Sequence, residues 1–395
     1  MTLRHAAVNV LLAIERGKTT LAAEVDRARQ QLIDERDRAL LVELTSGTLR
    51  WRATLDALIS QCSRQPVARL SPGVRATLRL AVYQLEHLDR VPAHAVLNEA
   101  VELTRTLRES SAAGFVNGVL RTLTRTRNRL SLPPRPGPAA TADDQLTYLS
   151  TTLSHPKWLV ERWLHRHGFE AAERWCQFNN TTPSAGMGEA SRALADAVAP
   201  PPGARMLDVC AAPGGKTIVF AAHLQGHGLL VAADYRPSRV RLLSRTLEHA
   251  GLRVPIVALD ATRALPFGPV FDRVFVDAPC SGLGVLRRDP DLKWSRQPDD
   301  LPDLAMIEHR ILTRAADVVA PGGLLIYATC SSEPAENDGV VQQFLASDDR
   351  FASEPLHTGP MILETALIDE HGFFRTLPFR DGLDAFFAAG LRRVE

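Results

Sequence analysis

The sequence contains few cysteines, and none stands close to another along the chain. No CxxC pair occurs among the five, which are Cys62, Cys176, Cys210, Cys280 and Cys330. This spacing argues against a disulfide framework and against a structural zinc site. Apolar runs of the roughly 20 residues that cross a bilayer are also absent. The opening MTLRHAAVNVLLAIERG lacks a small-residue cleavage site, which favours a folded helix over a signal peptide. We expect a cytoplasmic protein with no metal and no membrane contact.

The near-neutral net charge of +1 conceals an uneven distribution. Residues 1–135 carry 21 Lys and Arg against 13 Asp and Glu, whereas the remainder carries 25 against 32. Of those 21 basic residues only Lys18 is a lysine. Arginine binds phosphate in bidentate fashion and stacks on bases, so the composition of residues 1–135 favours binding to nucleic acid. A genome that favours Arg codons would produce the same bias, because the rest of the chain is also rich in arginine.

Residues 1–130 show the spacing of amphipathic helices throughout. Apolar residues recur at intervals of three and four, as in Val8, Leu11, Leu12 and Ile14. Strand-like alternation is absent from this range, which predicts an all-α domain. Residues 131–150 open with the proline-rich SLPPRPGPAAT and are predicted to be a linker. A helical connector is expected over 151–200.

Residues 201–395 change to short apolar runs that alternate with helical stretches. The runs are RMLDVC, GLLVAAD, VPIVALD, FDRVFVDA and GGLLIYATC. Such runs, each followed by a turn and a helix, indicate βαβ units around a buried parallel sheet. We expect FASEPLHT and HGFFRTLPFRDGLDAFFAAGLRR to add antiparallel strands at the edge of that sheet.

A glycine-containing loop follows the first predicted strand. It consists of Cys210, Ala211, Ala212, Pro213, Gly214, Gly215 and Lys216. A phosphate-binding P-loop requires a glycine where Cys210 stands, and the dinucleotide fingerprint GxGxxG is absent. A nicotinamide oxidoreductase is therefore a weak alternative. The loop fits a sheet that binds a nucleoside without a phosphate chain.

Three of the following strands end in a carboxylate. Asp234, Asp260 and Asp277 end the second, third and fourth predicted strands. In folds of this plan the carboxyl edge of the sheet binds the ligand, where Asp234 could accept bonds from ribose hydroxyls and Asp260 from an adenine amino group. For each aspartate alone, capping of a helix N-terminus is the alternative.

Two cysteines fall on the same edge although fifty residues separate them. Cys280 follows the fourth strand in DAPCSG, and Cys330 ends the next strand in YATCSS. A redox pair and half of a metal site are alternatives, but the absence of a nearby His or third Cys argues against metal. Methylation at carbon 5 of cytosine would use such residues, because a thiolate that adds to carbon 6 makes carbon 5 nucleophilic. A carboxyl group beside the base would favour protonation at ring nitrogen 3.

Three segments are similar to the motifs of a known enzyme family. DVCAAPGGKT, DAPCSGLGVLRRDPDLKW and YATCSSEPAEND resemble the signatures of the Sun/Fmu family of RNA (cytosine-5) methyltransferases. The resemblance implies S-adenosylmethionine as cofactor, ribosomal RNA of the small subunit as substrate and 5-methylcytosine as product. It implies Cys330 as nucleophile and Cys280 as the group that assists product release. Cofactor contacts are implied at residues 210–216 and at Asp234, Asp260 and Asp277, with Lys216 and Asp277 also facing the cytosine.

The N-terminal half carries a second resemblance. RVPAHAVLNEAVELTR and GFVNGVLRTL are similar to the NusB-type helical RNA-binding domain. Together the two resemblances imply an all-α NusB-like domain over 1–130 and a Rossmann-like class I methyltransferase domain over 201–395. We expect a monomer that binds RNA.

One interval departs from the family pattern. Family members carry a small α+β RNA-binding subdomain after the FNNTTP segment, where this chain has only PSAGMGEASRALADAVAPPP. An RNA-binding or ribosome-assembly protein with weakened or lost catalysis is therefore the alternative function.

Overall fold

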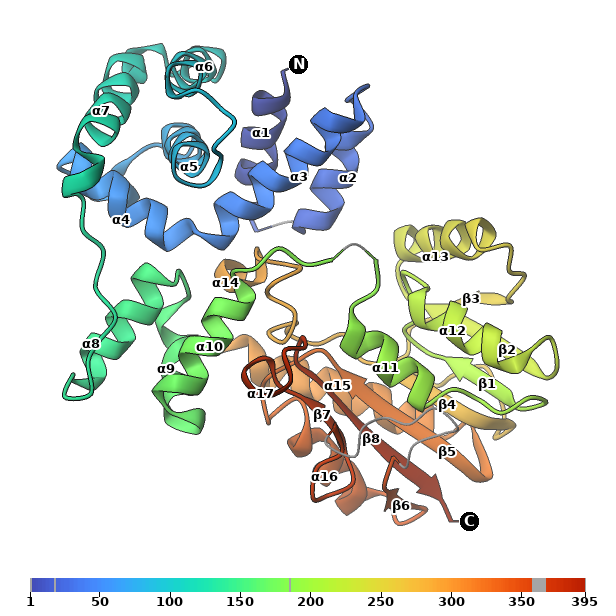
Figure 1. Cartoon of the computed structure of the whole chain (residues 1–395). Coiled ribbons are helices and arrows are strands. Elements are labelled where there is room, and N and C mark those ends of the chain that lie inside the picture. The colour runs from blue at the N-terminus through green and yellow to red at the C-terminus, as the bar shows by residue number, and fades with distance from the viewer. Residues whose placement is uncertain (1, 18, 185, 357–366, 395) are drawn as a thin grey trace. The chain divides into compact units, whose positions relative to one another are not determined.

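The computed structural model describes residues 2–17, 19–184, 186–356 and 367–394 (Figure 1). The chain divides into two compact units. The first, called here the helical unit, comprises Met1–Thr182 and Leu286–Ser295. The second, called the sheet unit, comprises Pro183–Val285 and Arg296–Glu395.

The helical unit begins with seven α-helices around one apolar core. Their bounds are α1 Leu3–Glu15, α2 Leu21–Arg29, α3 Glu35–Arg50, α4 Arg52–Ser63, α5 Pro72–His87, α6 Ala93–Thr106 and α7 Ala113–Thr126. The side chains of Thr2, Thr20, Asp34 and Ser71 accept bonds from the first free amides of α1, α2, α3 and α5. Helix α5 is buried along most of its length, at the centre of this group. The predicted all-α domain is confirmed for the described residues.

Further helical segments complete this unit. They are the short helices η1 Val67–Arg69, η2 Ser110–Ala112 and η3 Arg127–Arg129, then α8 Ala142–Thr147, η4 Tyr148–Thr152, α9 Lys157–His167 and α10 Phe169–Asn179. A ten-residue segment from the C-terminal half, with α14 Leu292–Ser295, also packs here. Its buried Lys293 donates to the carbonyls of Arg50 and Ser154, and Trp294 Nε1 donates to the carbonyl of Leu49.

The sheet unit is built on one mixed sheet. Its strands are β1 Arg205–Asp208, β2 Leu229–Asp234, β3 Ile256–Ala258, β4 Phe271–Asp277, β5 Val319–Thr329, β6 Phe351–Glu354, β7 Phe374–Thr376 and β8 Phe386–Arg393. The order is β3-β2-β1-β4-β5-β8-β6, and β7 also pairs with β8. Strands β1 to β5 pair in parallel, and β8 runs antiparallel to β5. This is the parallel sheet that the apolar runs predicted, in the Rossmann-like arrangement that the family resemblance implied.

The position of β8 differs from our expectation. We predicted that the last segments add strands at the edge, which is right for β6 but wrong for β8, because β8 lies between β5 and β6. The physical reason is its continuous apolar run, buried from Phe386 to Leu391, which suits a strand covered on both faces. The end of the FASEPLHT segment, residues 357 and 358, lies outside the described residues.

Helices cover both faces of this sheet (Figure 1). Side chains of α11 Glu189–Ala197 and α12 Gly215–Leu224 pack with the strand residues Met206, Phe275 and Ile326. Those of α15 Asp300–Ala316 and α16 Asp338–Ser347 pack on the other face with Leu207, Val274 and Leu325. Two further helices are α13 Pro237–His249, against β2 and β3, and the short α17 Pro378–Asp381. Alternate residues of each strand thus enter opposite cores.

The parallel register brings the ends of four strands to one edge. Asp208 pairs with Phe275, and Asp277 pairs with Ala328, two residues before Cys330. The carboxyl ends of β1, β2, β4 and β5 therefore meet there, which places the loops that follow them side by side. Within the described ranges, every helix is too short or too polar to cross a membrane.

Candidate active site

The loop between β1 and α12 carries the predicted glycine motif. Gly214 has φ of +110°, and a Cβ there would lie 2.9 Å from Leu243 Cδ1. A Cβ on Gly215, the first residue of α12, would lie 2.7 Å from Met187 Cε. Both positions therefore favour glycine, and the first amides of α12 lie next to this tight turn. The preceding alanines of the motif are buried and Pro213 is exposed.

Asp234, at the end of β2, lies beside this loop. Its carboxylate accepts hydrogen bonds from the amide of Ala212 at 3.2 Å and from that of Tyr235 at 2.9 Å. Arg239 Nε lies 3.0 Å from Asp234 Oδ1, and the same guanidinium donates to the Ala212 carbonyl at 2.7 Å. Asp234 thus ties the glycine loop to the second strand.

Asp260 is engaged in its own turn. Its Oδ1 accepts from the amide and the hydroxyl of Thr262, at 3.0 and 2.7 Å, and these bonds lower the pKa of the carboxyl group. Asp260 thus closes a turn and caps no helix, so the helix-capping alternative is wrong for this residue. A contact of Asp260 with a cofactor stays a prediction.

Asp208 is a fourth carboxylate that the sequence analysis missed. It is fully buried at the end of β1, and Thr217 Oγ1 donates to its Oδ2 at 2.7 Å. Its Oδ1 has no hydrogen-bond partner within the described part of the chain. Burial, with the nearby charges of Asp277 and Asp234, raises the pKa of Asp208 to about 7. The signal was present in RMLDVC, where β1 also ends in Asp.

Lys216 and Asp277 form an ion pair at the same edge. Lys216 Nζ donates to Asp277 Oδ2 at 2.8 Å. Burial alone would lower the pKa of Lys216, but the neighbouring Asp277 outweighs it and the pKa is raised. The Cys330 sulfur is close enough to contribute to this shift, so Lys216 supplies positive charge beside that thiol.

The two predicted cysteines meet. Cys280 Sγ and Cys330 Sγ lie 3.2 Å apart, because each follows one of the adjacent parallel strands β4 and β5. The hydrogen bond to Cys330, together with burial, raises the pKa of Cys280 well above its ordinary value. Cys280 therefore keeps its proton and can donate it towards Cys330. The structure thus brings Lys216, Asp277, Cys280 and Cys330 together, whereas burial raises the pKa of Cys210, which leaves that thiol unreactive.

The buried carboxyl group of Glu308, close to Cys280, should make the stability of the sheet unit depend on pH. Burial, the charge of Glu336 and the proximity of Cys280 raise the pKa of Glu308 to about 11. An unfolded glutamate loses its proton near pH 4.5, whereas folded Glu308 keeps it, so folding binds a proton between these values. The free energy of unfolding should therefore fall as pH rises from about 4.5 towards 11.

Replacing this group by a neutral amide should remove that dependence. We expect Glu308→Gln to raise the midpoint of thermal unfolding by about 5 °C at pH 8.5 and to change it little at pH 5. Thermal scans at both pH values measure this. Glu370→Gln, at a largely exposed side chain, is the matched control and should show no gain. An equal effect of Glu308→Gln at both pH values would contradict the protonated state.

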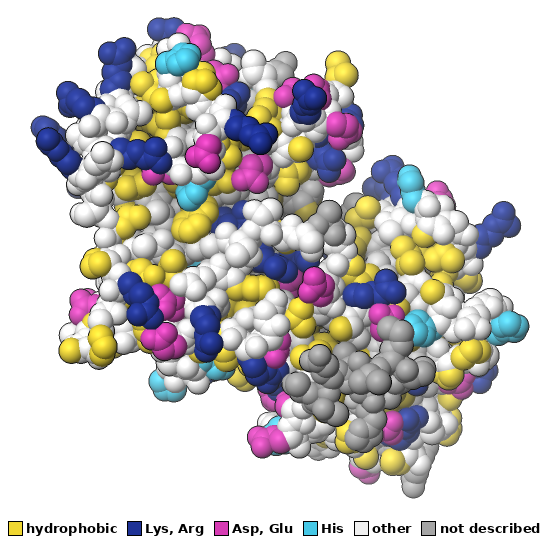
Figure 2. All heavy atoms as spheres, viewed as in Figure 1, with side chains coloured by type: hydrophobic (Ala, Val, Ile, Leu, Met, Phe, Trp, Pro, Cys, Tyr) yellow, Lys and Arg dark blue, Asp and Glu magenta, His cyan; other side chains and the backbone are white. Residues whose placement is uncertain are grey.

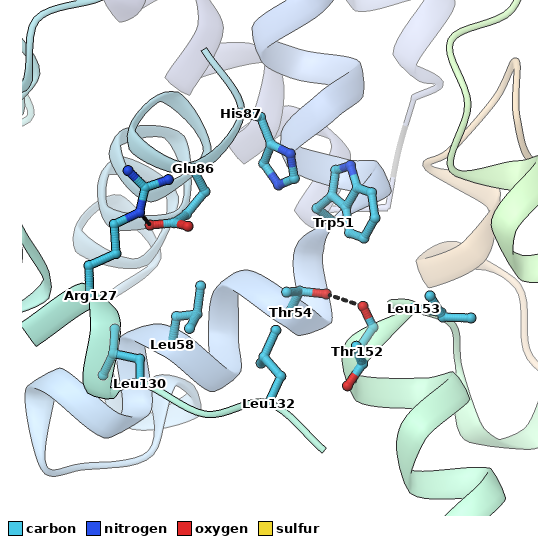
Figure 3. A pocket seen from close by; sticks show the side chains of 10 residues that line it. All are labelled: Trp51, Thr54, Leu58, Glu86, His87, Arg127, Leu130, Leu132, Thr152 and Leu153. Carbon is cyan, nitrogen blue, oxygen red and sulfur yellow. Dashed lines mark hydrogen bonds and ion pairs between the residues drawn. The ribbon is translucent and has the colours of Figure 1, made fainter. Parts of the chain in front are cut away.

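The helical unit contains a separate pocket of about 410 Å³ (Figure 3). The Trp51 and His87 rings stack at 4.9 Å on one side, and leucines such as Leu58 line the floor. Arg127 Nε lies 3.1 Å from Glu86 Oε1, so the basic group at the rim is already paired. All lining residues belong to the helical unit, and none is one of the predicted site residues. Among the described residues no group of three His, Cys, Asp or Glu could hold a metal ion.

Comparisons with known proteins agree with the two units. Residues 195–392 match the family model described as 16S rRNA methyltransferase RsmB/F, and residues 1–125 match the NusB family. The chain is 31% identical to the ribosomal RNA small subunit methyltransferase B of Pseudomonas putida, over 100% of this chain and 99% of that protein. It is 29% identical to the probable ribosomal RNA small subunit methyltransferase B of Bacillus subtilis, over 99% of each.

A solved structure shows the same fold. The crystal structure of PH0851 superposes with a TM-score of 0.76 at 21% identity, covering 100% of both chains. The family models and the Pseudomonas putida relative confirm the family resemblance seen in the motifs, and the fold class is confirmed as well. The chain belongs to the RsmB/F family of 16S rRNA methyltransferases and carries a NusB-family domain over residues 1–125.

Proposed function

We propose that this enzyme transfers a methyl group from S-adenosylmethionine to carbon 5 of a cytosine in small-subunit ribosomal RNA, with Cys330 as the nucleophile. The observation that carries the proposal is the pair of thiols, 3.2 Å apart, beside the Lys216–Asp277 ion pair. The names of the Pseudomonas putida and Bacillus subtilis relatives support the substrate class.

The residues at the carboxyl edge fit the proposed cofactor. S-adenosylmethionine, when bound, supplies a methyl group on a positively charged sulfur. The edge holds the carboxyl groups of Asp208, Asp234 and Asp277, which can accept hydrogen bonds from a nucleoside, and a turn at Gly214 that has no room for a side chain. S-adenosylmethionine would be held by the loop from Cys210 to Lys216 together with Asp234, Asp260 and Asp277. Asp208 is an addition to the set inferred from sequence.

Addition of Cys330 to the base would be the first step. The thiolate forms a bond to carbon 6, and the electron pair of the 5,6 double bond moves to carbon 5, which becomes nucleophilic. Lys216 favours the thiolate by its charge, and a carboxyl group at Asp277 favours protonation of nitrogen 3. A stacked base hides the face that sulfur attacks, so the target must be single-stranded or flipped out.

Release would be the second step and would use Cys280. The proton on carbon 5 leaves, its electron pair restores the 5,6 double bond, and the bond from Cys330 to carbon 6 breaks. While Cys330 is bonded to the base it is an uncharged thioether, so its hydrogen bond no longer raises the pKa of Cys280, although burial still does. Once Cys280 has passed its own proton to solvent, its thiolate can accept the carbon 5 proton. Bonding of Cys330 to the base thus favours this change of role.

Nucleoside analysis tests the reaction itself. RNA incubated with the enzyme and S-adenosylmethionine labelled in the methyl group should yield labelled 5-methylcytidine after digestion to nucleosides. Label in another nucleoside, or at another atom of cytidine, would contradict the proposal.

A basic segment of the helical unit is the proposed RNA contact. Residues 110–142 contain five Arg and no Asp or Glu. Arg121, Arg125 and Arg129 are exposed, whereas Arg127 and Arg135 are paired with glutamates. Figure 2 shows basic side chains over the part of the helical unit where Figure 1 places α7. Arg121, Arg125 and Arg129 form no ion pair with an acidic residue in the described ranges, so they are suited to bind phosphate groups.

Removing these charges should weaken RNA binding in a salt-dependent way. For the triple replacement of Arg121, Arg125 and Arg129 by Ala we expect about tenfold weaker binding. The slope of log affinity against log salt should fall by about 2, at roughly 0.7 for each lost contact. Filter binding at several salt concentrations measures both. The control removes Arg27, Arg38 and Arg105, each paired with a glutamate, and should leave the slope unchanged.

One observation favours a second candidate, an RNA-binding protein with weakened catalysis. Between residues 183 and 204 the described residues form the single helix α11 and no strand. The alignment with the Bacillus subtilis relative spans 458 positions against the 395 residues of this chain, so it includes positions that only the relative fills. Tight RNA binding with no labelled nucleoside would favour this candidate.

A further inference from the structure

A single buried carboxylate links the two loops that carry the cysteines. Glu336 lies before α16 and is fully buried. Its Oε1 accepts from the amide of Ser281 at 2.6 Å, and its Oε2 accepts from the hydroxyl of Ser281 at 2.6 Å and from that of Ser331. Ser281 directly follows Cys280, and Ser331 directly follows Cys330. The two serine hydroxyls themselves lie 3.1 Å apart.

The Glu336 carboxylate is stabilised by neutral donors. In the described part of the chain no Lys or Arg forms an ion pair with it, and three of its donors come from the two serines. The adjacent Glu308 also forms a side-chain hydrogen bond with Glu336, and burial and the charge of Glu336 raise the pKa of Glu308 to about 11. A buried carboxylate without a cation is a costly feature, which suits a role at a functional site better than one in stability alone.

The backbone around Cys280 depends on this contact. The turn is fixed at its ends, where Ala278 N donates to the Ala328 carbonyl and Gly284 N to the Cys330 carbonyl, both at 2.9 Å. Between these ends the Ser281 amide donates to Glu336, and Arg296 Nε donates to the Ser281 carbonyl at 2.9 Å. The position of the Cys280 thiol is therefore set largely by Glu336 and Arg296.

The turn after Cys330 is held by Glu336 and by the residue that follows it. The Asn337 side chain, next to Glu336, donates to the Ser331 carbonyl at 3.1 Å and lies 2.5 Å from Thr329 Oγ1. Tyr327, on β5, donates to the Glu336 carbonyl at 2.5 Å. Residues 336 and 337 thus bind the turn after Cys330 directly, while the Glu336 carboxylate extends across to the turn after Cys280.

We propose that Glu336 is a positioning residue that sets the distance between the Cys280 and Cys330 thiols by holding the serine that follows each of them. Its catalytic consequence rests on the proposed function, because the release step needs Cys280 beside carbon 5, the neighbour of the carbon bonded to Cys330. An error of about 1 Å in such a geometry can slow a reaction by about 100-fold. Loss of the carboxylate should therefore slow release more than addition.

The distance can be tested without RNA. Oxidised glutathione takes two electrons from the thiols of Cys280 and Cys330, which form a disulfide while two reduced glutathione molecules are released. The equilibrium constant, measured by alkylation and peptide mass spectrometry in glutathione buffers, reports how closely the thiols are held. We expect Glu336→Gln to lower this constant at least about tenfold. Glu308→Gln replaces the neighbouring glutamate by an amide that can still donate to Glu336, so it is a matched control and should leave the constant unchanged.

A second variant guards against a folding defect. Ser331→Ala removes the contacts of the Ser331 hydroxyl with Glu336, Ser281 and the Glu333 amide but leaves both bonds from Ser281 to Glu336, so it should fold and lower the constant by a smaller factor. Circular dichroism checks both proteins. In assays with RNA, Glu336→Gln should in addition accumulate the covalent protein–RNA adduct.

The outcomes separate the two proposals. An unchanged disulfide constant in folded Glu336→Gln and in Ser331→Ala would overturn the positioning role, whatever the activity. A lowered constant together with a wild-type enzyme that makes no 5-methylcytidine would refute the proposed function and leave the positioning role standing. If the disulfide constant fell as much in Glu308→Gln as in Glu336→Gln, the cause would be a general loosening of the core, and this result would also overturn the proposal.

Discussion

Replacing Cys330 by alanine is expected to reduce methyl transfer to RNA by more than about 10⁴-fold. Without the sulfur nothing adds to carbon 6 of the base, and carbon 5 stays unreactive. Initial rates with labelled S-adenosylmethionine measure the loss. RNA affinity should change little, because the proposed RNA contact is the basic segment of the helical unit, whereas Cys330 belongs to the sheet unit.

A control cysteine separates this effect from general damage. Cys62 lies in the apolar core of the helical unit, and Cys62→Ala should keep the rate within a few-fold of wild type. If Cys330→Ala retained a tenth of the wild-type rate, the nucleophile would have to be another group.

The second large effect is expected at Cys280. Cys280→Ala should allow addition and methyl transfer but block loss of the carbon 5 proton, so that a covalent protein–RNA adduct accumulates. Denaturing gel electrophoresis should show a protein–RNA band that is absent, or far weaker, in the wild type. The double replacement Cys280→Ala/Cys330→Ala should abolish this band, because the adduct requires the Cys330 sulfur. Normal product release by Cys280→Ala would show that the assigned role is wrong.

The central part of the site could be predicted because sheet geometry orders it. Asp277 and Cys280 follow β4 and Cys330 follows β5, and adjacent parallel strands end at the same edge. The two sulfur atoms therefore lie 3.2 Å apart, although fifty residues separate the two cysteines in the sequence. The glycine loop was predictable for the same reason, since it follows β1 in the centre of the sheet.

The supporting residues could not be chosen from the sequence. The segment SSEPAEND contains three acidic residues, and only folding shows that Glu336 accepts from both serines. Glu308 lies on α15, and its raised pKa depends on which carboxylate packs beside it. Asp208, by contrast, was readable from sequence, because it ends its strand as Asp234 and Asp277 do.

Two features of the fold also escaped the sequence patterns. The segment LRRDPDLKWS begins inside the motif DAPCSGLGVLRRDPDLKW, whose first part lies in the sheet unit, yet it packs into the helical unit through Lys293 and Trp294. The packing of this segment depends on individual hydrogen bonds to the helical unit, and such contacts produce no periodic pattern in the sequence. For β8, the antiparallel direction was right, but its interior position depends on pairing with β6 and β7.

The covalent bond between Cys330 and cytosine is tested most directly with RNA that contains 5-fluorocytidine. Fluorine at carbon 5 cannot leave as a proton, so the wild-type enzyme with S-adenosylmethionine should remain attached to the RNA. Proteolysis and nuclease digestion, followed by mass spectrometry, should give a peptide with the methylated fluorocytidine on Cys330. Attachment at Cys280, or no attachment by enzyme that makes 5-methylcytidine from ordinary RNA, would contradict the account.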